Sequence, residues 1–395
     1  MKFSRLDKLK AAEGRKPEEP AKAPEAAPRQ PETPAAPPPA QAPSLPQVPA
    51  APPPAPRPVP RFLRGLPEPA KKEPPFRELD SQAKKIYARL LEQSAELLAR
   101  TDQPYTEQFE AVRRCCFQVA DALKKNPVLL NYSNYSTRDN YLVAHTANST
   151  IVALAMGLAA SLDGPELELL GFCAMAHDIG MTGYSHLFNS TSPLSEAQFA
   201  ELAQHVEDSV RKLDRIVDLD YKVKARAKRV VLQVHERLDG AGYPDHRSSE
   251  EIDPLAQFIG IADAYEALTH PRPWRAAISG PEAVKQLVEK EGRGFNAKAI
   301  KALIAAVTIY PPGSLVQLST RETARVLKLN KGSITRPLVE LLLDKQGLEM
   351  KPAELDLIKL PLTSIERGMT LAEIAKYHPD LAAKLEQEQW WAEPL

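Results

Sequence analysis

The chain has 395 residues, more than the roughly 100–200 of a usual single domain, so one large domain with additional segments is expected. Lysine plus arginine (51) balances aspartate plus glutamate (51), so no global field favours nucleic acid or an acidic membrane surface as a partner. Three cysteines exclude a disulfide framework and a thiolate metal site, and they indicate reduced thiols in the cytoplasm.

Residues 1–75 carry 22 of the 38 prolines, interleaved with alanine, glutamine and glutamate. Proline lacks an amide donor and bars helix, and the tract has few large apolar residues to bury, so it predicts a disordered Pro/Ala-rich tail. A tether is the simpler interpretation, and docking of a protein partner that reads proline is the alternative. We expect no membrane span, because the longest apolar run, residues 151–162, is shorter than the ~18 residues required.

Helical patterns fill the middle of the chain. From residue 76, apolar residues at helical spacing, such as Ile86, Leu90 and Leu97, predict a helical lead-in over residues 76–140, with a second helix near residues 105–123. Similar patterns run almost without a break through residues 141–308, with glycine and proline marking the turns. We therefore expect an all-α domain there.

After residue 309 the pattern changes to short runs rich in β-branched or alternating residues, at 315–319, 323–329 and 337–343. These runs predict a small antiparallel β-sheet subdomain over residues 309–344. Residues 345–395 are interpreted as a C-terminal helical tail, with helices near 370–377 and 381–389. Trp390 and Trp391 at its end would dock on the protein itself or on a partner.

Histidines and aspartates stand out within the helical patterns. Taken singly, a histidine such as His145 is more often a hydrogen-bonded core or surface residue than a ligand. Asp178, however, follows His177 at the end of the apolar stretch 169–176, and Asp263 is an acidic residue within the apolar run 258–268. A carboxylate in such a setting is unfavourable unless a positive charge compensates it, and a divalent cation would do so. A buried ion pair or helix cap is the alternative. Nitrogen and oxygen ligands without thiolate suit iron, manganese or zinc.

The ordered set of motifs resembles the HD-GYP family, a branch of the HD superfamily, over about residues 140–343. The matching text is His145-Thr-Ala-Asn148, His177-Asp178-Ile-Gly180, His205, His235-Glu236-Arg-Leu-Asp239-Gly-Ala-Gly242-Tyr243-Pro244, Asp263-Ala-Tyr-Glu-Ala-Leu-Thr269 and Arg272-Pro-Trp-Arg275. A lone His-Asp pair is weak evidence, whereas this ordered set with the Gly-Tyr-Pro loop is specific.

The resemblance implies an all-α HD-type catalytic domain that holds two divalent metal ions, usually iron or manganese, and hydrolyses cyclic di-GMP. His177 and Asp178 would lie at the catalytic core, with Asp178 bridging both ions. The family's metal ligands correspond to His145, His177, Asp178, His205, His235 and Asp263. Arg272 and Arg275 would contact substrate phosphate, with a solvated helix end as the alternative, and Tyr243 would border the site or only shape its turn. The oligomeric state is left open, a homodimer included.

Three positions depart from the family. Met181 stands where the family has a lysine, Val234 replaces a metal-ligating histidine, and Tyr141 replaces a glutamate of members with three metals. These changes leave three hypotheses: an active phosphodiesterase of reduced rate, a module that only binds the nucleotide or a protein partner, and a phosphohydrolase on another nucleotide.

Overall fold

The computed structural model describes residues 76–100, 108–126, 128–137, 141–217, 219–272, 275–289, 293–307, 310, 312–330 and 333–388. The predicted disordered tail, residues 1–75, and the tryptophans Trp390 and Trp391 lie outside the described residues.

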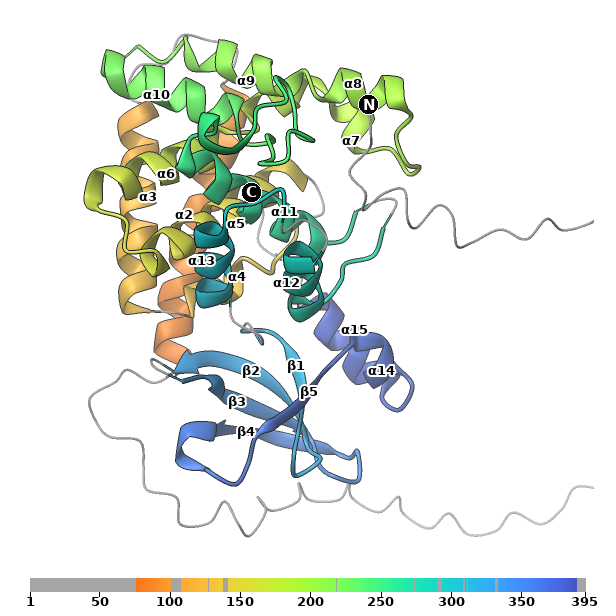
Figure 1. Cartoon of the computed structure of the whole chain (residues 1–395). Helices are drawn as coiled ribbons and strands as arrows, with labels where there is room; N and C mark the ends of the chain where they lie inside the picture. The colour runs from red at the N-terminus through yellow and green to blue at the C-terminus, as the bar shows by residue number, and fades with distance from the viewer. Residues whose placement is uncertain are drawn as a thin grey trace, which may run out of the picture. The chain divides into compact units, whose positions relative to one another are not determined.

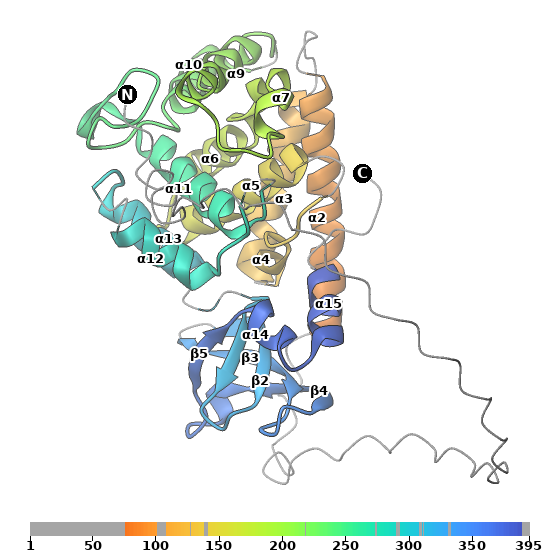
Figure 2. The same ribbon diagram turned by 90° about the vertical axis from the view of Figure 1, so that its right-hand side faces the viewer.

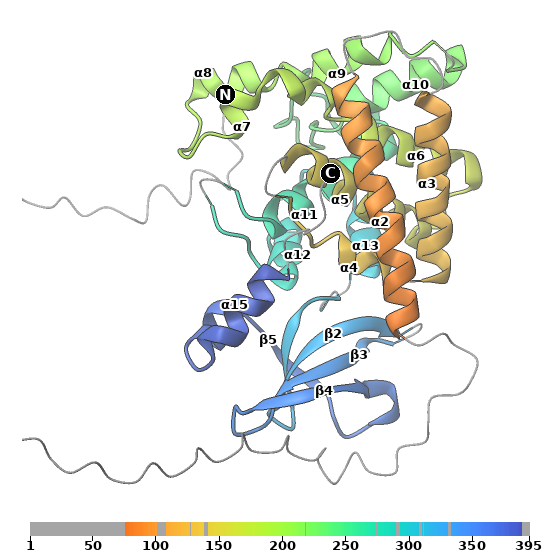
Figure 3. The same cartoon turned by 180° about the vertical axis from the view of Figure 1, so that it is seen from behind.

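The lead-in is helical, as the apolar spacing predicts. It consists of α2 (Phe76–Ala99), α3 (Gln108–Lys125) and the short α4 (Leu129–Tyr132). Along α2, Ala83, Tyr87, Leu90 and Leu91 are fully buried, because residues three or four apart lie on one face of a helix. Helices α2 and α3 lie side by side in Figures 2 and 3.

Helix α5 (Tyr141–Ala159) is the centre of the helical part (Figure 1). It packs against α2, α3, α6 (Gly164–Ala176), α11 (Pro254–Thr269) and α13 (Ala297–Val307). Among the described residues it is the one helix long and apolar enough to cross a membrane, but 83% of that apolar window is buried inside the fold. Its apolar composition is therefore that of a core helix.

Shorter helices complete this part, and side chains cap several of them. They are η2 (Ile179–Gly183), α7 (Ser185–Phe188), α8 (Glu196–Leu202), α9 (His205–Leu213), α10 (Tyr221–Leu232), η3 (Ser249–Glu251) and α12 (Gly280–Glu289). Asp220 accepts amide hydrogens at the start of α10, and Asp253 does so at the start of α11, where Pro254 occupies the first turn.

The C-terminal part is an antiparallel five-stranded sheet in the order β4-β3-β2-β1-β5. Its strands are β1 (Leu315–Leu318), β2 (Thr323–Asn330), β3 (Ser333–Leu343), β4 (Glu349–Asp356) and β5 (Ile365–Met369). The short helices η4 (Leu357–Lys359), α14 (Leu371–Ala375) and α15 (Pro379–Gln387) accompany it. The predicted combination of a mostly helical protein with a small C-terminal antiparallel sheet is confirmed.

The extent of the predicted sheet was wrong, because β4 and β5 fall in the segment that we interpreted as a helical tail. Both are edge strands of the sheet. In β4 most side chains are exposed or half-buried and Pro352 interrupts the run, so the alternation typical of a strand with one buried face is missing. The two predicted C-terminal helices are present as α14 and α15.

Candidate metal centre

The six predicted ligands come together from five parts of the chain. His145 lies on α5, His177 directly follows α6 as its C-cap, and Asp178 precedes η2. The other three are the first residue of α9 (His205), a residue after α10 (His235) and a residue of α11 (Asp263). All six side chains are at most 15% exposed, so the polar cluster is enclosed by the helices.

The cluster contains two triads of potential ligands that share one carboxylate. His145, His177 and Asp178 form one triad, and Asp178, His205 and His235 form the other, with the ligand atoms of each triad within 4.8 Å of one another. Asp263 lies between them, with its carboxylate oxygens 3.4 Å from His145 Nε2 and 3.6 Å from His235 Nδ1.

Hydrogen bonds at the outer ring nitrogens orient two imidazoles toward Asp178. His177 Nδ1 lies 2.8 Å from the carbonyl of Ala174, and His205 Nδ1 lies 2.7 Å from that of Leu202. A carbonyl can only accept, so Nδ1 carries the proton and the lone pair is on Nε2, which points inward. His177 Nε2 and Asp178 Oδ1 are buried and have no hydrogen-bond partner among the residues that the structure describes. Such orphaned acceptors are typical of groups that bind a cation.

The spacing of the inner atoms also fits a metal ion. Asp178 oxygens lie 3.3 Å from Nε2 of His145 and of His205 and 3.5 Å from that of His177. These separations exceed the roughly 2.7–2.9 Å of a charge-assisted hydrogen bond. Ligands bonded at ~2.1 Å around one ion, however, lie about 3 Å apart. The donor set of imidazole and carboxylate therefore fits a divalent cation, and all three cysteines are buried outside the cluster.

The electrostatics keep the carboxylates ionised. Burial alone would raise the pKa of Asp178, but His177 and the other surrounding histidines hold it well below its usual range. The pKa of Asp263 is likewise lowered, by His145 and His235, against the effect of burial. Burial lowers the pKa of His235, which favours the neutral imidazole that a metal requires.

Sequence analysis did not identify Glu266, which supports the centre from outside. It is 2% exposed, and its Oε2 lies 2.5 Å from His145 Nδ1 and 3.0 Å from Arg272 Nη2. Burial would raise its pKa, but His270, His145 and Arg272 hold it well below the usual value, so the carboxylate is charged. The signal in the sequence was its position three residues after Asp263, on the same face of α11.

The Gly-Tyr-Pro loop is folded tightly against His235. A Cβ on Gly242 would lie 2.4 Å from the carbonyl oxygen of His235, so only glycine fits this approach. Buried Glu236 accepts hydrogen bonds from the amides of Asp245 (2.8 Å) and Arg247 (2.9 Å) and thereby fixes the loop. The Tyr243 ring stacks on the His235 ring with centroids 4.9 Å apart, so Tyr243 lies against a predicted ligand.

The two predicted phosphate-binding arginines differ in their surroundings. The Arg272 side chain is 6% exposed and lies 4.0 Å over the Tyr141 ring, and its Nη1 has no partner in the described part of the chain. Arg275 donates to the main-chain carbonyls of Ala267, Leu268 and Ala276 at the end of α11. Contact between Arg275 and a phosphate would require it to leave these carbonyls.

The three residues that depart from the family pattern are Met181, Val234 and Tyr141. Met181 and Val234 belong to the main hydrophobic cluster of the helical part and are 7% and 1% exposed. The hydroxyl of Tyr141 stays protonated, because burial raises its pKa to about 12. None of the three supplies an anionic oxygen or an imidazole nitrogen.

Comparison with known proteins agrees with this geometry. Residues 130–298 match the HD domain family, and residues 315–377 match the KOW domain associated with the HD domain. Residues 345–377, which the sequence pattern assigned to a helical tail, are thus part of the match to the KOW domain. The chain is 30% identical over 224 residues to a cyclic di-GMP phosphodiesterase of Pseudomonas aeruginosa. The match covers 56% of this chain and 53% of that protein.

Other relatives are more distant. A cyclic di-GMP phosphodiesterase of Borreliella burgdorferi is 23% identical over 231 residues, covering 57% of this chain and 58% of the relative. A solved HD-GYP-type protein of Bdellovibrio bacteriovorus is 18% identical, with a TM-score of 0.48 over 60% of this chain and 73% of that chain. The match thus spans little more than half the length of these two curated relatives. Residues 130–298 are an HD domain, residues 315–377 are the KOW domain associated with it, and the chain is homologous to the HD-GYP cyclic di-GMP phosphodiesterases.

Proposed function

We propose that the helical domain hydrolyses a phosphodiester bond of cyclic di-GMP at a centre of two divalent ions, iron or manganese. The observation that carries this proposal is the pair of ligand triads that share Asp178. One acidic residue common to two triads is the arrangement expected of a carboxylate that bridges two metals. The substrate is inferred from the relatives, whose names give cyclic di-GMP as the compound they hydrolyse.

The residues around the ions have distinct roles in this proposal. The ions, when bound, would acidify a water molecule and neutralise charge on the phosphodiester. His145, His177 and Asp178 would hold one ion, and His205, His235 and Asp178 the other, with Asp263 between them.

The remaining groups act on the substrate or on the ligands. Arg272 offers its unpartnered Nη1 to a phosphate oxygen. Glu266 holds His145 with Nε2 facing the centre, and Tyr243 packs on His235 and excludes water from that side. Arg275 remains a proposed substrate contact, subject to its release from the carbonyls of α11.

The altered positions favour a reduced rate over an unchanged one. A lysine would add a cation to the site and a histidine would add a ligand, whereas buried Met181 and Val234 add neither. We therefore expect turnover to be slower than that of relatives with the complete motif.

The test is hydrolysis of cyclic di-GMP by the full chain loaded with manganese or iron(II), with separate measurement of linear dinucleotide and mononucleotide. The metal-free chain is the control, and 3′3′-cGAMP is the comparison substrate, because a Vibrio cholerae relative is named as specific for it. We expect metal-dependent product from cyclic di-GMP. No product, together with saturable binding that Arg272→Ala abolishes, would instead establish a binding module. Product from 3′3′-cGAMP alone would correct the substrate.

A further inference from the structure

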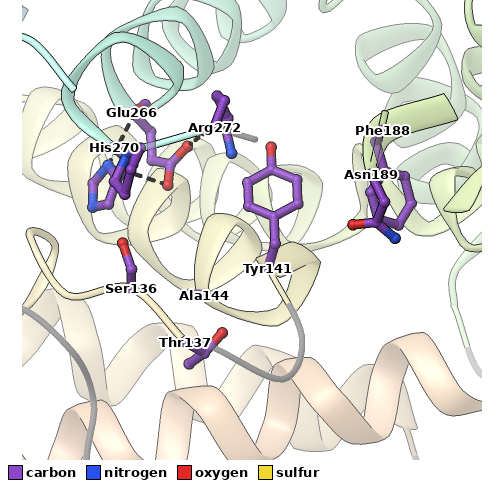
Figure 4. Close-up of a pocket in the computed structure, with 10 residues that line it drawn as sticks. Ser136, Thr137, Tyr141, Ala144, Phe188, Asn189, Glu266, His270 and Arg272 are labelled. Carbon is purple, nitrogen blue, oxygen red and sulfur yellow. Dashed lines mark hydrogen bonds and ion pairs between the residues drawn. The ribbon is translucent and has the colours of Figure 1, made fainter. Parts of the chain in front are cut away.

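Figure 4 shows a pocket of about 470 Å³, which we call the side pocket. It is lined by Ser136, Thr137, Tyr141, Ala144, Phe188, Asn189, Glu266, His270, Pro271 and Arg272. Its volume is within the roughly 300–1,000 Å³ of small-molecule sites. Two of its residues also contact a predicted metal ligand: Glu266 Oε2 lies 2.5 Å from His145 Nδ1, and the Tyr141 ring is 5.5 Å from the His145 ring.

The two sides of the side pocket differ in chemistry. In Figure 4, Tyr141 lies between the charged residues Glu266 and Arg272 on one side and the pair Phe188 and Asn189 on the other. The first side carries a guanidinium that is held by Glu266 and stacked on Tyr141. The second side has an aromatic wall, because the rings of Tyr141 and Phe188 are in contact with centroids 5.9 Å apart. An anionic group suits the first side, and a flat apolar ring with polar edges suits the second.

Polar groups in the side pocket lack partners within the described part of the chain. Arg272 Nη1 is buried and makes no hydrogen bond, although its side chain is only 6% exposed. The amide of the exposed Asn189 and the hydroxyl of the half-buried Ser136 make no side-chain hydrogen bond to any described residue, so both are available to a ligand. A buried guanidinium nitrogen without a partner is unfavourable and indicates that a ligand supplies the missing acceptor.

We propose that the side pocket binds the nucleotide that flanks the scissile phosphate, with its phosphate toward Arg272 and its purine base against Tyr141 and Phe188, where Asn189 determines base specificity. This inference rests on the proposed hydrolysis of a cyclic dinucleotide. The Asn189 amide presents one donor and one acceptor, which match the adjacent acceptor and donor on a purine edge. Aromatic rings stack on any base, so the aromatic wall supplies affinity for the base. The Asn189 amide supplies discrimination between bases.

Binding to the metal-free full chain tests the pocket without any catalysis. Isothermal titration calorimetry would compare GMP with ribose 5-phosphate, which has the same phosphate and sugar but no base. We expect GMP to bind at least about tenfold more tightly, from stacking and base-edge hydrogen bonds. Phe188→Leu should remove most of that preference, because it removes a stacking ring, and Asn189→Ala should reduce it. His186→Ala is the matched control, because His186 is on the same short helix, is exposed and does not line the pocket.

Equal affinity for GMP and ribose 5-phosphate would overturn the proposal, as would equal effects of Asn189→Ala and His186→Ala. Steady-state kinetics on cyclic di-GMP separates this inference from the proposed function. If the metal-loaded chain turns over cyclic di-GMP and Asn189→Ala leaves KM unchanged, the base pocket is refuted and the activity stands. If GMP binding depends on Asn189 but no diester is hydrolysed, the pocket stands and the activity is refuted.

Discussion

The helical domain and the C-terminal sheet both have an apolar core, but the helical domain also encloses a cluster of ionisable side chains. The main cluster inside the sheet is apolar, with Val316, Val339 and Leu341 among its fully buried members. The helical domain adds imidazoles and carboxylates to its apolar core, of which His177 and Asp178 are 1% and 6% exposed. Removing such groups from water is unfavourable unless they are paired or bind a cation.

This difference separates the residues that stabilise the fold from those that serve function. Truncation of a buried residue in the sheet should lower the free energy of unfolding and leave metal binding intact. Removal of a charged group from the helical centre should weaken metal binding without lowering the free energy of unfolding of the metal-free chain, because the ionised groups there are stabilised by a bound cation. The predictions below test this separation, from the largest expected effect to the smallest.

Asp178→Ala should have the largest effect, because it removes the ligand common to both triads. We expect bound metal to fall to near zero by elemental analysis and any hydrolysis to fall by at least about 10³-fold, more than the loss of one charge-stabilising donor. Added manganese should raise the melting temperature of the wild type but not of the variant, since a ligand stabilises only the state that binds it. Asp214→Ala, which removes an exposed partner of Lys228, is the control. Unchanged metal content would mean that the ligand assignment is wrong.

Leu341→Ala probes the other region. Leu341 is fully buried in the sheet, and such a truncation costs about 2–5 kcal/mol, or on the order of 30- to 4,000-fold in the local folding equilibrium. Hydrogen exchange should show faster opening of β2 and β3, while metal content stays that of the wild type. Leu348→Ala, at a position 42% exposed, should change little. Loss of metal together with the sheet would show that the two regions are energetically coupled.

The helical domain and the sheet also differ in how well the sequence predicts their parts. The apolar spacing of α2 and the alternation in β1, β2 and β3 are local signals, so those elements were predictable. The strands β4 and β5 were not, because edge strands such as β4 leave polar side chains in water. The sequence alone identified four of the predicted ligands, because they are polar residues within apolar helical segments: His145, His177, Asp178 and Asp263. Glu266 and Asn189 did not stand out, because the residues around them come from segments far apart in the chain. Glu236 did not stand out either, because its partners are backbone amides of the following loop, which leave no side-chain pattern in the sequence.

Glu266→Gln should weaken metal binding without removing a ligand. The carboxylate contacts both His145 Nδ1 and Arg272 Nη2, so its charge orients a metal ligand and a substrate-binding group together. Loss of such an outer contact typically lowers metal affinity about 10- to 100-fold, which competition with a chelator would measure. Glu266→Asp should recover part of the affinity, and Glu282→Gln, at an exposed position of α12, is the control. If metal affinity is unchanged while only stability falls, Glu266 has a structural role alone.

Asp253, which is not a predicted metal ligand, should make the free energy of unfolding depend on pH. Burial would raise its pKa, but Arg226 (3.3 Å) and Arg229 (2.9 Å), with the amide of Leu255, lower it in the folded chain. A carboxyl with a lowered folded pKa stabilises the fold above its unfolded pKa of about 3.9, and this contribution is lost as pH falls through the folded value. Asp253→Asn keeps the helix cap but removes the charge, so it should cost about 1 kcal/mol at pH 7, since both arginines are partly exposed. Urea unfolding from pH 7 to pH 3 should show the two proteins converging below about pH 4. A constant difference across that range would mean that Asp253 acts through packing rather than charge.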